Sequence, residues 1–236
     1  MKQEFKEAIF KYIDNHKVYY LPEQENDFFK TVEFFNSGIL CFDRPDGFCK
    51  KDNSVLIIEH FEFDSSNNTK KGSQNRQEEA RISRREHEST DISFIRDQIN
   101  CNYSIENYIK NAKKFFDSHY NNIQEYKKNL KKEKIITDTT EVKTLFCIED
   151  VTVLGNYDIN ERTPVILLYR DEFIEYVKDC SELDYILCFS SFGQETYNWF
   201  ASIKNILEYK ENALKKENIK LAELQPQVIS TRVRVK

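Results

Sequence analysis

The helices of this chain are predicted by hydrophobic residues that recur every three or four positions. In the segment 105–123, isoleucine, tyrosine and phenylalanine residues form one stripe that follows Ser104, a favourable N-cap residue. The segment 27–36 carries a similar stripe and precedes Gly38, and a glycine is typical of the position just past a helix. The same pattern predicts further helices at residues 4–14, 78–88, 171–180 and from about 199 to 224.

Shorter apolar runs between turn-forming residues predict strands. Three of them follow one another closely, at 39–43, 47–51 and 54–64. The turn at 45–47 contains proline, aspartate and glycine, and the turn at 52–53 contains aspartate and asparagine, residue types that favour tight turns. We expect further strands at residues 145–154, 165–169, 185–190 and 228–235.

The order of these elements indicates a mixed α/β fold, in which helices flank a mixed sheet. A three-strand meander indicates an antiparallel beginning, and the later alternation of strands and helices indicates crossover connections. We expect one domain over residues 1–236, with its core at 27–190. Residues 65–77 are polar and predict a mobile loop, residues 78–132 predict a helical insertion, and a helix plus a strand complete the chain.

The composition is typical of a cytoplasmic protein. The net charge of −5 gives no overall attraction to nucleic acid or to anionic membranes, so such a partner requires a local basic patch. No apolar run approaches the roughly 20 residues of a membrane helix, so we expect no membrane partner. The six cysteines show no Cys-x-x-Cys spacing, and glycine-rich phosphate motifs are absent, which argues against a nucleotide cofactor. The oligomeric state stays open.

The turn at 52–53 sets the register of the two strands around it. With a two-residue turn, the numbers of paired residues sum to 105, so Asp46 lies opposite Glu59. Opposed residues of an antiparallel pair have their Cβ atoms roughly 5 Å apart. Two carboxylates at this distance repel each other and are partly desolvated. A divalent cation with oxygen ligands is a natural counter-charge for them.

The same residues allow a simpler interpretation. Proline, aspartate and glycine in succession form a strong turn signal, so Asp46 can serve to cap the turn between the first two strands of the meander. A glutamate at the end of a buried strand, such as Glu59, often marks the point where the strand reaches solvent. The sequence leaves both interpretations open.

The segment from Pro45 to Glu59 resembles the first part of the signature of the PD-(D/E)XK nuclease superfamily, whose core is restriction-endonuclease-like. The resemblance rests on a Pro-Asp pair, a hairpin, a hydrophobic strand that ends in Glu59, and the predicted order of elements. It implies that Asp46 and Glu59 form the catalytic pair and bind Mg²⁺ or Mn²⁺, with Glu33 on the preceding helix as a further ligand. The family's lysine, two residues after the second acid, is replaced here by Phe61.

The missing lysine leaves two outcomes open. Either another side chain takes its place, or the chain is an inactive descendant of the family that keeps the fold. Lys50 shares the face of Asp46 but lies roughly 13 Å along the strand. Gln77, at the end of the polar loop, and Arg81, in the helix that follows it, are the better candidates.

A dense basic region follows the acid pair. In a nuclease-like protein it would contact the phosphates of DNA or RNA, because lysine and arginine bind phosphate groups. Glutamates interleave with these residues, so a solvated helix with i,i+4 ion pairs explains the pattern equally well. The region consists of Lys70, Lys71, Arg76, Arg81, Arg84 and Arg85.

The histidines carry little information. His60, Glu62 and Asp64 alternate on the strand face opposite Glu59, a pattern typical of the solvent side of a half-exposed strand, although it also allows a second polar site. The remaining histidines, including His119, have no ligand spacing to a cysteine or aspartate, which argues against a zinc site.

These observations favour a divalent-metal-dependent, nuclease-like protein that acts on the phosphodiesters of DNA or RNA and is either active or catalytically degenerate. The alternative is a non-enzymatic binding or interaction protein on the same α/β fold. One observation separates them: whether a lysine, arginine or glutamine side chain lies within hydrogen-bonding distance of Asp46 and Glu59.

Overall fold

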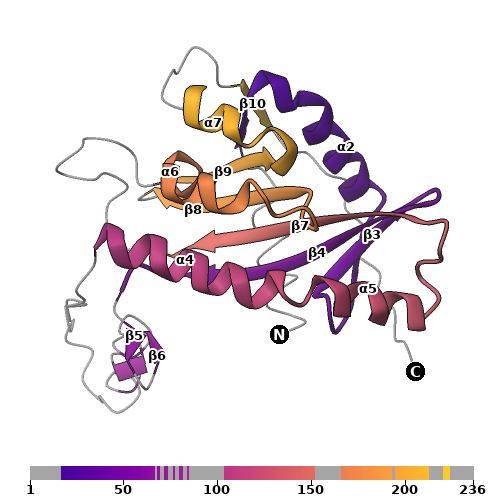
Figure 1. Ribbon diagram of the computed structural model, residues 1–236, viewed down its shortest axis with the longest axis horizontal. Coiled ribbons are helices and arrows are strands. Elements are labelled where there is room, and N and C mark those ends of the chain that lie inside the picture. The colour runs from indigo at the N-terminus through magenta and orange to yellow at the C-terminus, as the bar shows by residue number, and fades with distance from the viewer. Residues whose placement is uncertain are drawn as a thin grey trace, which may run out of the picture.

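A mixed sheet forms the centre of the protein. The computed structural model describes residues 17–66, 104–151, 166–192, 195–212 and 220–223, together with residues 68, 69, 72, 73, 77, 80, 81 and 84. The strands of the sheet are β1 (Lys17–Tyr20), β2 (Ile39–Cys41), β3 (Gly47–Lys51), β4 (Ser54–Phe63), β7 (Glu141–Asp150), β8 (Tyr185–Phe192), β9 (Glu195–Ser202) and β10 (Lys220–Glu223). Among the described residues they form one eight-stranded sheet in the order β10-β1-β9-β8-β7-β4-β3-β2 (Figure 1). Two short strands, β5 (Asn68–Thr69) and β6 (Gly72–Ser73), pair separately.

Helices cover both faces of this sheet. One face packs against α4 (Ile105–Tyr120), α5 (Ile123–Lys132), α6 (Asp171–Val177) and α7 (Leu207–Asn212), and the other against α2 (Glu25–Asn36). Three 3-10 turns complete the described elements: η1 (Pro22–Gln24), η2 (Leu167–Tyr169) and η3 (Ile203–Asn205). Within the described part of the chain, no helix has the length and apolar composition that a membrane crossing requires. The architecture is therefore a three-layer mixed α/β fold, as the sequence predicts.

The central strand β4 is buried on both faces, so its alternate side chains enter different layers. Val55 and Ile57 belong to the hydrophobic cluster that contains α4 and α5, whereas Leu56 and Ile58 belong to the cluster that contains α2. All four side chains are inaccessible to solvent. This arrangement explains why β4 reads as a continuous apolar run. Its alternation places Glu59 on the same side as α4 and α5.

The pairing of β4 with its neighbours joins the antiparallel and parallel parts of the sheet. Strands β2, β3 and β4 form the antiparallel meander, in which Gly47 pairs with Ile58 and Lys51 with Ser54. The paired residues sum to 105, which confirms the predicted register. On its other side, β4 runs parallel to β7, and β7 runs parallel to β8. The first of these parallel connections passes through α4 and α5, which lie within the expected helical insertion at 78–132 and cover one face of the sheet.

Two of the expected elements are wrong. Residues 165–169 are predicted as a strand, but Leu167–Tyr169 form the 3-10 turn η2. A helix is predicted from about residue 199 to residue 224, but both ends of this range are strands. Trp199 lies in β9 and pairs with Cys188 of β8, and residues 220–223 form β10. A short apolar run does not distinguish a buried strand from a helix, and only the neighbouring strands decide between them.

Some of the expected elements lie outside the described residues. These are the helix at 4–14, the strand at 228–235 and parts of the segment 65–88. Within that last segment, residues 77, 80, 81 and 84 are helical.

Substitution of Phe116 tests the packing of α4 on the sheet. This fully buried ring lies 5.4 Å from the ring of Phe146 on β7 and 5.8 Å from the ring of Phe173 on α6. We expect Phe116→Ala to lower the free energy of unfolding by about 3–5 kcal/mol, because it leaves a cavity between three elements. Urea denaturation measures this loss. In Phe29→Ala, at a position that is 48% exposed, the loss should stay below about 1 kcal/mol; equal losses would contradict this packing.

Candidate functional site

The turn between β2 and β3 places Asp46 directly before the first residue of β3. The backbone NH of Phe42 donates to the carbonyl oxygen of Asp46 across this turn at 2.9 Å. The ladder of β3 and β4 pairs Gly47 with Ile58, and the preceding residue of β3 therefore meets the following residue of β4. The structure thus brings Asp46 and Glu59 together at the end of the hairpin.

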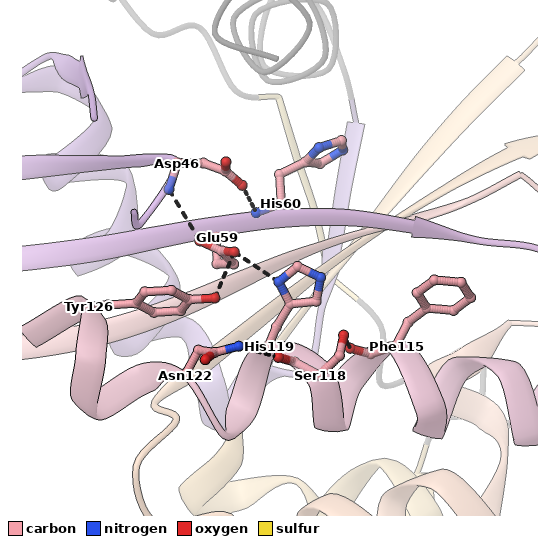
Figure 2. Close-up of polar contacts among 8 residues, drawn as sticks. All are labelled: Asp46, Glu59, His60, Phe115, Ser118, His119, Asn122 and Tyr126. Atoms are coloured by element: carbon pink, nitrogen blue, oxygen red, sulfur yellow. Dashed lines mark hydrogen bonds and ion pairs between the residues drawn. The ribbon is translucent and has the colours of Figure 1, made fainter. Parts of the chain in front are cut away.

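Hydrogen bonds hold Asp46 against β4. Its backbone NH donates to Oε2 of Glu59 at 3.1 Å, and its Oδ2 accepts from the backbone NH of His60 at 3.0 Å (Figure 2). The side chain of Asp46 therefore bonds across to the neighbouring strand and does not cap its own turn. Within the described part of the chain, Oδ1 of Asp46 has no hydrogen-bond partner.

Glu59 lies in the layer between the sheet and the helices, where two side chains reach it. Oε1 accepts from Nδ1 of His119 on α4 and from the hydroxyl of Tyr126 on α5, both at 2.8 Å (Figure 2). Only 6% of Glu59 is exposed, so an unpaired charge would be costly here. Three donors, including the backbone NH of Asp46, make the carboxylate stable in this environment.

His119 is oriented from two sides. Its ring stacks on the ring of Phe61, with 4.5 Å between centroids and 8° between planes. Phe61 is buried and packs edge-on against Phe146. With Nδ1 bound to Glu59, the ring directs Nε2 away from that carboxylate, and Nε2 has no hydrogen-bond partner among the described residues. The aromatic ring at the position of the missing lysine thus supports a histidine.

The two acids differ in their electrostatic surroundings. Burial and, next, the charge of Glu59 together raise the pKa of Asp46 to about 6, against the opposing effects of His60 and His119. Burial and Glu59 also raise the pKa of Tyr126 well above its ordinary value, so its hydroxyl stays protonated and donates. Among the described residues, the carboxylate of Asp46 accepts one hydrogen bond where that of Glu59 accepts three, so the charge of Asp46 is the less compensated of the two.

The remaining predicted site residues lie elsewhere or are only partly described. Oε2 of Glu33 forms an ion pair with Nζ of Lys51 at 2.5 Å, and Lys51 lies four residues beyond Gly47, roughly 13 Å along the strand. The structure therefore does not bring Glu33 to the acid pair. Arg81 and Arg84 are helical, with Arg84 exposed. The other basic positions, Lys70, Lys71, Arg76 and Arg85, lie outside the described residues.

The basic side chain that bonds to the acid pair is a histidine, which is not one of the three residue types expected to separate the two functions. No lysine, arginine or glutamine of the described residues is hydrogen-bonded to Asp46 or Glu59, and this holds for Gln77 and Arg81. The one basic side chain among the described residues that bonds to either acid is His119. A polar residue on the inner face of a helix was the available signal, because His119 follows Phe116 by three positions. Tyr126 lies in a lysine-rich stretch, and its position gave no comparable signal.

The polar face of β4 opposite Glu59 also differs from expectation. His60, Glu62 and Asp64 are predicted to face solvent, but Asp64 is only 5% exposed and its Oδ1 accepts a hydrogen bond from the backbone NH of Ser66. Nε2 of His60 lies 3.2 Å from Oε2 of Glu149 on β7. His60 and Asp64 therefore find partners within the protein, His60 on the neighbouring strand β7 and Asp64 in the residues that follow β4.

No metal site of three or more ligands is formed by the described histidine, cysteine, aspartate and glutamate residues. Comparison of the chain with protein-family models, with curated proteins and with solved structures found no match. The resemblance to the PD-(D/E)XK superfamily therefore rests on the acid pair and on the order of elements alone.

The raised pKa of Asp46 predicts a pH-dependent effect of Asp46→Asn. The native state keeps its proton up to about pH 6, while the unfolded chain loses it near pH 4. Stability therefore falls as the pH rises between these values, by up to about 3 kcal/mol. Asparagine retains an acceptor for the NH of His60 but carries no charge. We expect this variant to be about 1–2 kcal/mol more stable than the parent at pH 8 and no more stable at pH 4.

Urea denaturation at the two pH values measures this difference. Asp43→Asn, at an exposed position in the same turn, is the matched control and should show no such change. A loss of stability in Asp46→Asn at pH 8 would mean that Asp46 serves the fold.

Proposed function

We propose that this protein is a divalent-metal-dependent, nuclease-like hydrolase that cleaves phosphodiester bonds of DNA or RNA at the Asp46–Glu59 pair. The observation that carries the proposal is the meeting of the two acids at the end of the β3–β4 hairpin, where the pKa of Asp46 is raised to about 6. Such an arrangement does not favour folding, and perturbed carboxylates of this kind gather at functional sites.

The order of the described elements supports the proposal. A helix, α2, precedes the antiparallel meander β2–β3–β4, and the helix α4 then leads to β7, parallel to β4. This is the order that the resemblance to the PD-(D/E)XK superfamily implies. Asp46 directly precedes β3 and Glu59 lies in β4, which agrees with the positions that the resemblance implies.

The two carboxylates suit a hard divalent cation. Asp46 offers Oδ1, which has no partner among the described residues, and the oxygens of Glu59 accept three of the roughly four hydrogen bonds that a carboxylate can take. Mg²⁺ and Mn²⁺ are commonly bound by one or two carboxylates, with water and substrate phosphate supplying the other ligands. When bound, such a cation promotes the ionisation of water and stabilises negative charge on the phosphate.

His119 takes the role that the family gives to a lysine. Its ring is oriented by the carboxylate of Glu59 and by the stacking of Phe61. Nε2 then faces away from Glu59, where it can accept a proton from an attacking water. A carboxylate that orients a histidine through Nδ1 is a common arrangement for general-base catalysis.

A calorimetric titration with Mn²⁺ tests the metal-binding pair. We expect one equivalent to bind to the parent protein, and both Asp46→Asn and Glu59→Gln to weaken binding on the order of 100-fold, because each removes an oxygen charge. Glu33→Ala is the control, and it should bind as the parent does because Glu33 pairs with Lys51. Unchanged binding in the Asp46 and Glu59 variants would exclude this pair as the metal site.

Substitution of His119 tests the proton-transfer role. We expect His119→Gln to lower kcat for phosphodiester hydrolysis in Mn²⁺ by about 10²–10⁴-fold, while the affinity for Mn²⁺ changes only a few-fold. Glutamine can still donate to Glu59, so the loss reports the ring nitrogen. His60→Gln, on the opposite face of β4, is the matched control, and its kcat should stay within a few-fold of the parent. Equal rates for His119→Gln and the parent would remove His119 from the mechanism.

One observation favours a second function, a non-enzymatic binding protein on the same fold. The position of the family's lysine belongs to Phe61, which is 5% exposed and part of the main hydrophobic cluster. A chain that binds Mn²⁺ or nucleic acid but hydrolyses neither DNA, RNA nor bis(p-nitrophenyl) phosphate would have this function.

A further inference from the structure

The helix that holds Tyr126 against Glu59 is also the most basic part of the described chain. Residues 127–134 contain five lysines and one glutamate. The whole protein carries a net charge of −5, so these lysines form a local positive region on an acidic molecule. Because these lysines follow Tyr126 in the chain, the contacts of α5 with its neighbours set where they lie relative to the acid pair.

Two contacts set α5 against the turn that carries Asp46. The hydroxyl of Tyr126 donates to Glu59 at 2.8 Å, and Nδ2 of Asn129 donates to the backbone carbonyl of Arg44 at 3.1 Å. Leu130 is fully buried in the hydrophobic cluster that also contains Val55 and Ile57 of β4. The helix therefore cannot turn about its axis without breaking these contacts.

Two exposed lysines of α5 lie near Asn129 in the helix. Lys132 follows Asn129 by three positions and so lies on the side of α5 that contacts the turn, and Lys128 is the neighbour of Lys132 one helical turn earlier. Arg44 itself is exposed. Its positive charge opposes the effects of burial and of Glu59 on the pKa of Tyr126, which places the guanidinium within electrostatic reach of the site.

These three cations are weakly engaged by the protein. Among the described residues, Lys132 and Arg44 have no ion pair, and Lys128 has only an exposed contact with Glu125 at 3.3 Å. By contrast, the lysines at 127 and 131 are paired with acids at 2.6 Å and 2.5 Å. The unengaged charges are thus Arg44, in the turn itself, and two lysines of the helix that contacts this turn.

We propose that Arg44, Lys128 and Lys132 form the surface that binds the phosphate backbone of a nucleic acid strand beside the Asp46–Glu59 pair. The inference rests on the proposed nuclease-like function for its substrate class. Two acids repel a phosphodiester, so a strand approaches them only where nearby cations offset the repulsion. The exposed guanidinium and the two lysines supply this charge, and they bind phosphate whatever the base sequence.

Fluorescence anisotropy in EDTA tests this surface without cleavage. The probes are 20-nucleotide DNA and RNA of one sequence, single-stranded and duplex, titrated at several KCl concentrations. We expect the slope of log K against log [KCl] to fall in magnitude by about two units in Lys128→Gln/Lys132→Gln and by about one unit in Arg44→Gln. Affinity should fall on the order of tenfold in the double variant. Tighter binding of DNA or of RNA identifies the natural strand.

The control is Lys30→Gln/Lys204→Gln. These two exposed lysines line a separate cleft of about 660 Å³ at the amino ends of β4, β7 and β8. The control removes the same charge and should bind as the parent does. An equal loss in the control, no loss in the α5 variants, or no binding of any probe by the parent would overturn the inference.

Hydrolysis of bis(p-nitrophenyl) phosphate in Mn²⁺ separates this inference from the proposed function, because so small a diester does not need the surface. Loss of nucleic acid binding in the α5 variants, with no hydrolysis by the parent, would support the surface and reject the catalytic function. Hydrolysis by the parent, with nucleic acid binding unchanged in the α5 variants, would reject the surface alone.

Discussion

The parallel pairing of β4 with β7 is the constraint on which the rest of the structure depends. Ten residues of β4 pair in register with ten of β7, and the β4 ladder continues on its other side into β3. Because helices cover both faces, the alternation of side chains along β4 decides which layer each one enters. Glu59 shares the face of Val55 and Ile57, and therefore enters the layer of α4 and α5.

A carboxylate in this layer requires hydrogen-bond donors. The helices that bury the apolar residues of β4 also supply these donors, through His119 and Tyr126. The same network that satisfies Glu59 orients the imidazole ring and leaves Asp46 as the less compensated acid. One strand position thus links the packing of the core to the chemistry that we propose for the site.

The local part of the site could be predicted from the sequence. A two-residue turn and a strand of alternating faces were enough to place Asp46 opposite Glu59, because both signals lie within 14 residues of each other. The partners of Glu59 could not be predicted, since His119 and Tyr126 are 60 and 67 residues away. Glu33 shows the converse: a ligand suggested by family resemblance lies at the other end of the hairpin, where Lys51 binds it.

The sequence by itself determined the mixed α/β class, the meander, its register and the meeting of the two acids. It did so because periodicity and turn chemistry report which face of its own element a residue occupies. Only the tertiary structure decided that Trp199 lies in a strand, that Phe61 supports His119, and that α5 contacts the turn of Asp46 through Asn129. Which elements meet on a face depends on how the whole sheet packs, and local sequence patterns do not carry that information.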